Sequence, residues 1–548
     1  MRTICGTILV AAVVAGAAWA DGSLMLMRLR APHTADDAQW AKTFKALAEN
    51  RGACDEVWFS TGIGIPKMDW HREHVERLMR YADELRAVGI VPSLQFQATL
   101  GHGDGITLQE GIDGKTWGGF TGPTGVECKA CSCPRQPGFL AYMREMSRIY
   151  TAFRPAWIWI DDDLRIDNHG PAIAWDSIGC WCPTCLSAFN AETGGKWTRE
   201  TLAAAIAKDA ALYDAWERFS FAGLAEVARV IATAVHEVSP ETHLAYQHGP
   251  WRNDAQLAVY KALHDATGLS VGSRPGGGPY GGCLYDQNPN VPPTKAMVAA
   301  RQKKVLGAPD WIGVWCPEVE TVPRAFASRT AQGMLVESIA SLAYGMNAVS
   351  MLVMDTRSET DEWYAENLLA PMSAERDVLK GYRDWNRDTV PAGLADESGE
   401  LVEKLYDYAL TGVPVVPGVG MTFGAITAKD VQLGISCQSS KSLCDLRRRA
   451  DERAGGRLPV LVRDPSIALV VPRVTKDGRL KSVMMLNARI DVQKPVTLVL
   501  RGVPEDVTSA TWRAFRNPPV TLTLRREGGE TLVTLPEISA WNAGWLAL

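Results

Sequence analysis

Short apolar runs recur along the first two thirds of the chain, and longer amphipathic segments separate them. The runs occupy residues 24–29, 56–60, 91–97, 157–160, 243–247, 269–273, 311–315 and 348–353. Short apolar runs are typical of the buried strands of a parallel sheet, and the periodicity between them predicts helices. Eight strand–helix repeats predict an α/β protein with a closed (β/α)8, or TIM, barrel. An open doubly wound sheet is the alternative, but no Gly-x-Gly-x-x-Gly motif follows the first run.

The pattern changes in the last third of the chain. Residues 393–456 are mixed in character, with one predicted helix at 398–410, and form a predicted connecting region. From residue 457 to 548, short alternating segments lie between turn signals such as Thr475-Lys-Asp-Gly478 and Arg526-Glu-Gly-Gly529. This pattern predicts a C-terminal antiparallel β-sandwich, which accompanies the barrel as an accessory domain.

The first twenty residues have the pattern of a secretory signal peptide. Arg2 supplies a positive start, residues 8–18 form a short apolar run, and Ala18-Trp19-Ala20 fits a small-x-small cleavage site. The run is too short to anchor the chain in a bilayer, and no later stretch has the pattern of a membrane span. We therefore expect a periplasmic or secreted protein, cleaved near Ala20, in which the barrel covers residues 21–392.

Composition and charge narrow the choice of partners. The 548 residues carry a net charge of -5, which gives no reason to expect binding to nucleic acid or to a membrane surface. The 19 tryptophans suit stacking on sugar rings, although tryptophan also fills protein cores. Polar and aromatic residues follow nearly every predicted strand, and this mixture favours a glycan or oligosaccharide as ligand. The sequence leaves homo-oligomerisation open.

Candidate catalytic carboxyl groups follow the fourth and seventh predicted strands. The fourth strand runs into Asp161-Asp162-Asp163, and Glu318 and Glu320 follow the seventh. The carboxyl ends of barrel strands meet at the face where barrels carry their active sites. Hydrolysis of a glycosidic bond needs one carboxyl group that protonates the leaving oxygen and a second that attacks the sugar carbon or activates water. Because side chains alternate in direction, Asp162 and Asp163 are not expected to face the ligand together, and we favour Asp162 with Glu318.

Other polar residues near the strand ends are candidates for substrate binding, and His169 is a candidate for proton transfer. The binding set comprises Arg28, Gln97, His102, Arg165, Asn168, Tyr246, His248, Arg274 and Asn347. Each member also has a structural interpretation, because a single histidine is more often structural and arginines pair with nearby carboxylates. Glu318 and Glu320 would likewise be explained by a solvated loop or by pairing with Arg324.

Six cysteines form two clusters that flank the fourth strand. The first holds Cys128, Cys131 and Cys133, and the second is a Cys-x-Cys-x-x-Cys element, Cys180, Cys182 and Cys185. Thiolates at this spacing suit a tetrahedral zinc ion, whereas a secreted protein also permits disulfides, so both interpretations stay open. Either role is structural, and no cofactor is expected for catalysis. The absence of His-Glu-x-x-His, Gly-x-Ser-x-Gly and P-loop motifs disfavours zincins, serine hydrolases of that type and NTPases.

The element Cys180-x-Cys182-x-x-Cys185-x-x-x-Phe189, just after a strand-four acid, resembles glycoside hydrolase family 42, the β-galactosidases. In that family a similar element and one earlier cysteine bind a structural zinc ion, the acid/base residue ends strand four, and the nucleophile ends strand seven. The resemblance implies zinc at Cys180, Cys182 and Cys185, with Cys131 as the fourth ligand. Three aspartates stand where the family has an Asn-Glu pair, so β-galactosidase specificity is not carried over.

Together these patterns predict a secreted or periplasmic glycoside hydrolase that cleaves a glycan or oligosaccharide with carboxyl groups from strands four and seven. One alternative is an exo-hydrolase of acidic sugars, a sialidase or uronidase, in which Arg28, Arg165 and Arg274 clamp a carboxylate and His169 replaces one carboxyl group. Another alternative is a carbohydrate-binding barrel without catalysis.

Overall fold

The computed structural model describes residues 22–101, 117–166, 178–249, 254–276, 291–320, 329–354 and 361–548. The predicted signal peptide lies outside the described residues. So do three candidate site residues, His102, Asn168 and His169.

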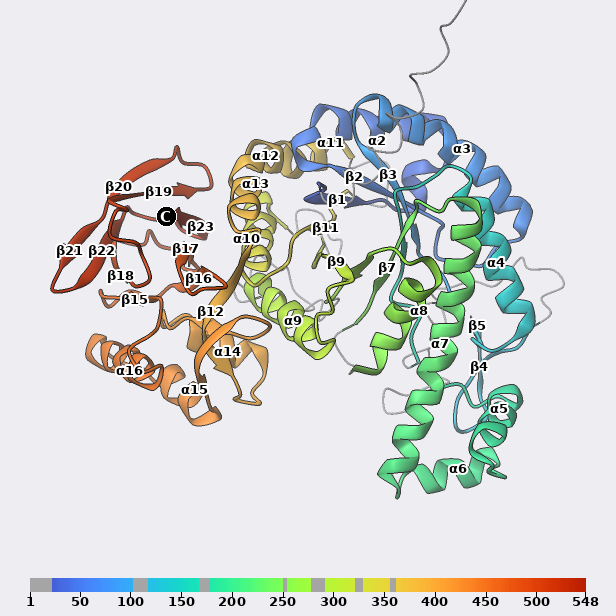
Figure 1. Cartoon of the computed structure of the whole chain (residues 1–548). Coiled ribbons are helices and arrows are strands. Elements are labelled where there is room, and N and C mark those ends of the chain that lie inside the picture. The colour runs from blue at the N-terminus through green and yellow to red at the C-terminus, as the bar shows by residue number, and fades with distance from the viewer. Residues whose placement is uncertain are drawn as a thin grey trace, which may run out of the picture.

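A parallel barrel forms the N-terminal part of the molecule (Figure 1). Its strands are β1 (Met25–Arg28), β2 (Glu56–Ser60), β3 (Val91–Phe96), β6 (Trp157–Ile160), β7 (His243–Gln247), β8 (Val271–Arg274), β9 (Ile312–Trp315), β10 (Glu318–Glu320) and β11 (Val349–Leu352). They pair in the order β10-β11-β1-β2-β3-β6-β7-β8-β9, and every pair is parallel. All eight predicted strands are present, and the predicted barrel is confirmed.

The seventh barrel strand is broken into β9 and β10, and the two halves close the barrel because each pairs with a different neighbouring strand. β9 pairs with β8, whereas β10 pairs with β11 on the other side. Pro317 lies in the break, where its missing N–H costs no ladder hydrogen bond. The chain stays bonded to β11 through the break, because the Ser350 N–H donates to the Pro317 carbonyl at 3.1 Å. The nine-stranded sheet is therefore an eight-stranded barrel with an interrupted seventh strand.

Helices cover the outside of the barrel. They include α2 (Asp37–Glu49), α3 (Met68–Ala87), α4 (Pro137–Thr151), α7 (Ala210–Val238), α8 (Leu257–Thr267), α9 (Val291–Val305) and α10 (Ala331–Ala343). By length and composition α7 would be able to cross a membrane, but most of that stretch is buried, and the helix packs against α4 and α8. This packing is typical of a helix in the outer layer of a barrel, which is buried against its neighbours.

Large side chains fill the lower part of the barrel lumen. Trp58, Trp157 and Trp159 form one apolar cluster with Leu26, Ala245, Cys316 and Ala348. The rings of Trp58 and Trp159 stack with centroids 4.1 Å apart. Gly272 belongs to the same layer, because a Cβ atom there would lie 2.8 Å from the Ala245 Cβ and 3.0 Å from the Trp159 ring. This packed floor leaves the polar residues above it at the carboxyl ends of the strands.

The C-terminal part consists of an eight-stranded and a four-stranded sheet that enclose a second core. The larger sheet holds β12 (Thr389–Asp396), β13 (Val415–Val416), β14 (Met421–Ile426), β16 (Leu469–Thr475), β17 (Leu480–Asn487), β19 (Ser509–Ala514), β20 (Val520–Thr523) and β23 (Asn542–Ala547). The smaller sheet holds β15 (Val460–Val462), β18 (Val496–Leu500), β21 (Arg525–Glu527) and β22 (Glu530–Leu535). The predicted sandwich is confirmed. The sequence pattern did not predict β12, which spans residue 392, or its parallel partners β13 and β14.

Three more helices, α14 (Val402–Ala409), α15 (Ala428–Ile435) and α16 (Ser440–Arg453), pack beside this sandwich, and α12 (Ala370–Ala374) and α13 (Arg376–Trp385) lead into it. Helix α10 joins the two parts, because it contacts α9 and β10 of the barrel as well as β16, β17 and β23. Every residue of α10 is buried.

Candidate active site and metal centre

The polar residues at the barrel mouth face the lumen because side chains alternate along a strand, and each of these residues lies two positions after a residue of the apolar layer below. Arg28, Asp161 and Gln247 each lie two positions after a lumen residue, and Arg274 lies two positions after Gly272. Gln95 joins them, because its side-chain oxygen accepts a hydrogen bond from Arg28 Nε at 3.4 Å. Five strands thus direct polar side chains into one place.

Two arginines pair with the acids of the site, and one of them, Arg274, links strand four to strand seven. Arg28 Nη1 lies 2.6 Å from Glu318 Oε1 and 2.6 Å from Glu320 Oε1. Arg274 Nη1 forms a salt bridge with Glu318, and its Nη2 lies 3.6 Å from Asp161 Oδ1 and 3.7 Å from Asp162 Oδ2. One guanidinium group therefore lies between Glu318 and the strand-four acids.

The structure decides how the strand-seven acids point. Glu318 and Glu320 are two positions apart in β10, and both contact Arg28. They therefore face the same side, the lumen. On strand four, Asp162 is the most exposed of these acids at 18 %, and Arg165 Nη1 lies 3.5 Å from its carboxyl group.

These surroundings push the pKa values of the acids apart. Burial alone would raise the pKa of Glu318, but Arg274 and Arg28 overcome this effect and hold that pKa well below its usual range. Burial and the neighbouring charge of Glu318 raise the pKa of Glu320 to about 7. Burial, followed by the charge of Asp161, raises the pKa of Asp162. Near neutral pH the site thus combines an ionised carboxylate with carboxyl groups that hold a proton more strongly.

Asp163, a predicted catalytic candidate, has a structural role instead. Its Oδ2 accepts hydrogen bonds from the backbone N–H groups of Thr99 at 2.6 Å and Gly101 at 2.7 Å, and its Oδ1 accepts one from Thr99 Oγ1 at 2.6 Å. The side chain is fully buried. It fixes the segment that follows β3, and because both of its oxygens are bound to the protein, this geometry favours a structural role over contact with a substrate.

Asp163→Asn should destabilise the protein by about 2 kcal/mol. It replaces one of the two accepting oxygens with an NH2 group, which cannot accept a hydrogen bond from Thr99 or Gly101. Urea unfolding followed by circular dichroism measures this loss. Asp162→Asn is the matched control and should change stability by less than about 1 kcal/mol, because Asp162 is partly exposed. Equal stability of both variants would contradict the anchoring role.

Three predicted substrate-binding residues lie elsewhere. Tyr246 and His248 alternate with the lumen residue Gln247 and point outward, where the Tyr246 hydroxyl donates to the Leu164 carbonyl at 2.7 Å. His248 Nδ1 lies 2.5 Å from the Tyr260 hydroxyl on α8. Burial, then Arg274, lowers the pKa of His248 to about 3, so the ring is neutral. Asn347 precedes β11 at the opposite end of the barrel and binds Gly313 and Trp315.

Gln97 lies at the mouth as predicted, where its side-chain oxygen accepts a hydrogen bond from Ser60 Oγ at 2.5 Å. Gln247 is a residue that the sequence analysis did not select. Its side chain is 0 % exposed, and neither its oxygen nor its nitrogen has a hydrogen-bond partner among the residues that the structure describes. Strand alternation was the signal that would have selected Gln247 over Tyr246 and His248.

A buried network of charged residues connects strand seven to the helices α9 and α10. Arg329 Nη1 donates to the Glu320 carbonyl at 2.7 Å, and Arg329 Nη2 lies 2.9 Å from Glu337 Oε2 on α10. Lys295 Nζ on α9 lies 3.2 Å from Glu337 Oε1. Since Arg329 bonds the backbone of Glu320, this network fixes the strand that carries both glutamates.

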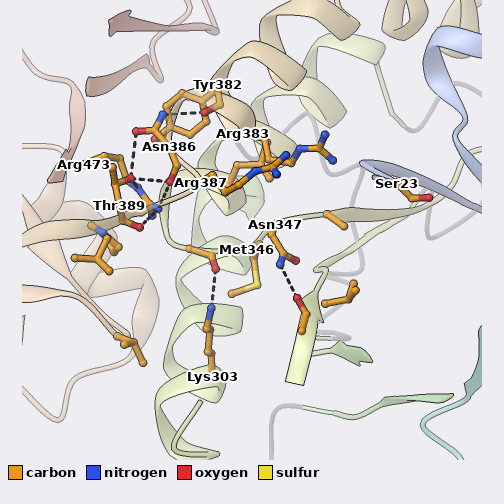
Figure 2. A pocket seen from close by; sticks show the side chains of 18 residues that line it. Ser23, Lys303, Met346, Asn347, Tyr382, Arg383, Asn386, Arg387, Thr389 and Arg473 are labelled. Carbon is orange, nitrogen blue, oxygen red and sulfur yellow. Dashed lines mark hydrogen bonds between the residues drawn. The ribbon is translucent and has the colours of Figure 1, made fainter. Parts of the chain in front are cut away.

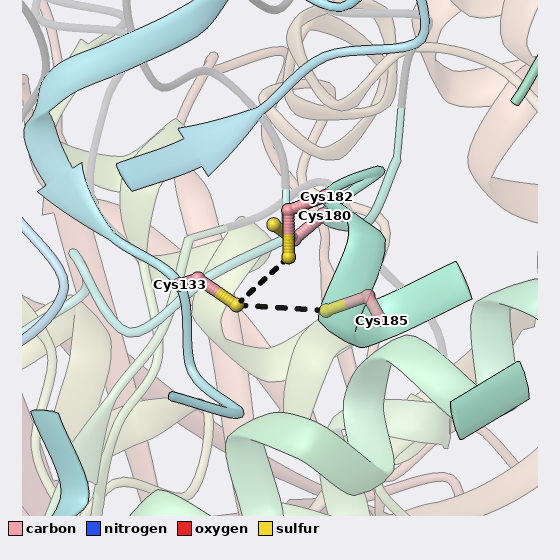
Figure 3. Close-up of side chains that lie close together, drawn as sticks. All are labelled: Cys133, Cys180, Cys182 and Cys185. Atoms are coloured by element: carbon pink, nitrogen blue, oxygen red, sulfur yellow. Dashed lines mark hydrogen bonds between the residues drawn. The ribbon is translucent and has the colours of Figure 1, made fainter. Parts of the chain in front are cut away.

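The cysteines from both sequence clusters meet in a single buried group (Figure 3). Cys133 follows β5 (Glu127–Ser132) of the hairpin with β4 (Gly119–Thr121), whereas Cys182 and Cys185 lie at the start of α5 (Pro183–Thr193), beside α6 (Arg199–Ile206). The Cys133 sulfur lies 3.6 Å from that of Cys182 and 3.5 Å from that of Cys185, and Cys180 completes the group within 4.8 Å. A tetrahedral zinc ion with bonds of about 2.3 Å separates its sulfur ligands by about 3.8 Å.

This geometry fits zinc better than disulfides, since bonded sulfurs lie about 2.05 Å apart. All ten cysteines of the described residues are free thiols. The fourth member is Cys133 and not Cys131, the predicted ligand. Both cysteines are buried, but Cys131 lies within β5, whereas Cys133 follows the strand and lies close to the other thiols.

Known proteins share the fold of this chain. No protein-family model matches it, and no curated protein sequence matches it. Similar structures include α-L-fucosidase isoenzyme 2 from Paenibacillus thiaminolyticus, with a TM-score of 0.59, 10 % identity, and coverage of 96 % of this chain and 99 % of that one. A β-galactosidase from Bacillus circulans sp. alkalophilus has a TM-score of 0.57 at 10 % identity, with coverage of 96 % and 99 %.

A catalytic mutant of a GH42 β-galactosidase from G. stearothermophilus also has a TM-score of 0.57 at 10 % identity, with coverage of 95 % of this chain and 98 % of that one. The likeness extends over the barrel and the C-terminal part together. The predicted resemblance to family 42 is thus confirmed at the level of the fold.

Proposed function

We propose that this protein is a glycoside hydrolase that acts on a glycan or oligosaccharide. In the proposed reaction Asp162 protonates the oxygen of the leaving group, while ionised Glu318 attacks the sugar carbon or activates a water molecule. The observation that carries the proposal is the opposed shift of two pKa values across one guanidinium group. Asp162 holds its proton more strongly than usual, and Glu318 holds its proton less strongly.

The pairing of the arginines favours a neutral sugar over an acidic one. Arg28 pairs with Glu318 and Glu320, Arg274 with Glu318, and Arg165 with Asp162. A sialidase or uronidase would need these guanidinium groups to bind a carboxylate of the substrate. Here protein carboxylates already take up their charge. Such an exo-hydrolase of acidic sugars is therefore the less favoured alternative.

Hydrolysis of a panel of aryl glycosides by the mature protein tests the proposal. Neutral sugars, uronides and sialosides all belong on the panel. Release from a neutral glycoside, lost in both Asp162→Asn and Glu318→Gln, is the expected result. Release from acidic sugars alone would favour the arginine clamp. If no glycoside is cleaved while a glycan array shows tight binding, the protein is a carbohydrate-binding barrel without catalysis.

The activity should have an alkaline limb that Asp162 controls. The acid must be protonated, so kcat/KM should fall as the pH rises through the raised pKa of Asp162. Glu318 must be ionised, and its lowered pKa keeps it so under acidic conditions. A pH profile with an activated aryl glycoside, which needs little acid assistance, should lose the alkaline limb in Asp162→Asn. Retention of the limb in that variant but not in Glu320→Gln would assign the acid to Glu320.

Gln247→Leu should lower kcat/KM by about tenfold without lowering the melting temperature. We propose that its amide, which has no hydrogen-bond partner among the described residues, binds a sugar hydroxyl, and a hydrogen bond of this kind is worth about 1 kcal/mol or more. Removal of an unsatisfied buried polar group does not weaken the fold. Calorimetry and initial rates measure the two effects, and a loss of stability with unchanged kcat/KM would contradict this role.

Two further proposals accompany the activity. Residues 1–20 support export to the periplasm or secretion, with the catalytic barrel beginning near residue 21. Cys133, Cys180, Cys182 and Cys185 would hold a structural zinc ion, which supplies a cross-link between the hairpin and α5 and takes no part in proton transfer.

A further inference from the structure

A cavity of about 430 Å³ lies at the end of the barrel opposite the candidate active site (Figure 2). Its walls come from the segments that precede β1 and β11, from β9, and from the ends of α9 and α10. On the other side α13, β12 and β16 complete it. The cavity therefore lies between the barrel and the C-terminal part, and its volume suits a small organic ligand.

Four cationic side chains line this cavity, and no carboxylate of the described residues does. The cations are Lys303, Arg383, Arg387 and Arg473. Asp384 lies beside the cavity, but its single negative charge is shared by three cations: Arg383, Arg387 and Lys380. Its Oδ1 lies 3.0 Å from Arg383 and 3.6 Å from Arg387, and its Oδ2 lies 2.5 Å from Lys380. Positive charge is in excess at this place.

The two inner cations have only neutral partners among the described residues. Arg473, which is 5 % exposed, donates to the carbonyls of Ala343 at 3.0 Å and Thr389 at 2.5 Å, and to Thr389 Oγ1 at 2.9 Å. Lys303 Nζ donates to the Gly345 carbonyl at 2.8 Å. Two of these carbonyls lie at the C-terminal end of α10, whose partial negative charge is only about half an elementary charge.

The two inner cations also repel each other. Burial, followed by the charge of Arg473, lowers the pKa of Lys303 to about 8. Burial lowers the pKa of Arg473 as well. Buried charges in proteins normally have a partner of opposite charge, because removal from water disfavours them. A bound anion would supply that partner here.

We propose that this cavity binds a small organic anion that carries a carboxylate or phosphate group. The charged group lies against Lys303, Arg387 and Arg473, and the carbon skeleton packs on Met346 and Pro391 at the cavity wall. Arg387 is 65 % exposed and receives the ligand from solvent, whereas Arg473 is buried. This site is separate from the barrel mouth and does not depend on the proposed hydrolysis.

Binding would also stabilise the contact between the two parts of the chain. Lys303 and Met346 belong to the barrel, whereas Pro391 and Arg473 lie on strands of the C-terminal sheet. A ligand that binds only the folded chain raises the melting temperature, and the rise grows with the logarithm of its concentration above the Kd.

Isothermal titration of the mature protein with inorganic phosphate and with citrate tests the proposal, and sodium chloride at matched ionic strength controls for screening. We expect saturable binding of at least one of the two anions at one site per chain, with a rise in melting temperature. The anion with the lower Kd then identifies the preferred group. Chloride should reproduce neither effect.

Two variants locate the site. Lys303→Met and Arg387→Gln should each raise the Kd about tenfold, since each removes a charge-assisted contact. Arg387 is largely exposed, so Arg387→Gln should fold normally even if Lys303→Met does not. Arg448→Gln, an exposed arginine on α16, is the matched control and should bind as the parent protein does. Absence of saturable binding, or equal binding by all three variants, would overturn the proposal.

Discussion

Glu318→Gln should lower kcat on the best substrate of the aryl glycoside panel by about a thousandfold and should also weaken the fold. The catalytic loss follows because an amide can neither attack the sugar carbon nor accept the proton of a water molecule. The structural loss follows because Arg274 would lose its nearest carboxylate inside a buried site. Removal of one partner of a buried ion pair costs about 3 kcal/mol. Initial rates below the melting temperature and urea unfolding measure the two effects separately.

Glu320→Gln is the matched control for this prediction. Glu320 shares Arg28 with Glu318 and is equally buried, but its pKa is raised instead of lowered. It should therefore keep most of the turnover. If both variants keep full turnover, strand seven does not supply a catalytic carboxylate. If Glu320→Gln is the more damaged variant, the nucleophile is assigned to the wrong glutamate.

The barrel strands are predictable from sequence because tertiary burial and local pattern agree. β2 and β6 are buried at every position, and the apolar residues 57–59 and 157–160 reveal them in the sequence. The C-terminal strands β12 and β14 have a different character. β12 contains Pro391 and Gly393, and β14 contains Gly424 in a left-handed conformation with φ of 156°. Proline and glycine are rare within strands, so local propensity hides pairing that only the folded sheet provides.

The types of residue at the site were predictable from the sequence, but which side chains face the barrel lumen was not. The sequence places acids after strands four and seven, and the fold brings them together at Arg274. Which neighbour faces the lumen depends on a shift of one residue, and that shift separates Gln247 from Tyr246. Strand seven adds a second difficulty, because the break at Pro317 hides the fact that Glu318 and Glu320 share one face.

The cysteine cluster shows the same limit. The spacing of Cys180, Cys182 and Cys185 indicates a common site, since all three lie within six residues. The fourth thiol comes from a hairpin some fifty residues earlier. The sequence there offers several neighbouring cysteines and no means of choosing between them as the fourth ligand. Only the end of β5 decides between them, because Cys131 lies within the strand, whereas Cys133 follows it and lies close to the other thiols.

Cys133→Ser should abolish binding of the structural zinc ion, whereas Cys131→Ser should retain one zinc per chain. A zinc site with four thiolates contributes its binding energy directly to folding, so its loss should destabilise the hairpin and α5 strongly. We expect a fall in melting temperature of about 10 °C or more, matched when a chelator strips the parent protein. Elemental analysis and calorimetry measure both effects. Cys131→Ser controls for the loss of a buried thiol, because Cys131 is fully buried outside the cluster. Zinc in Cys133→Ser, or a disulfide between Cys182 and Cys185 in the parent protein, would contradict the assignment.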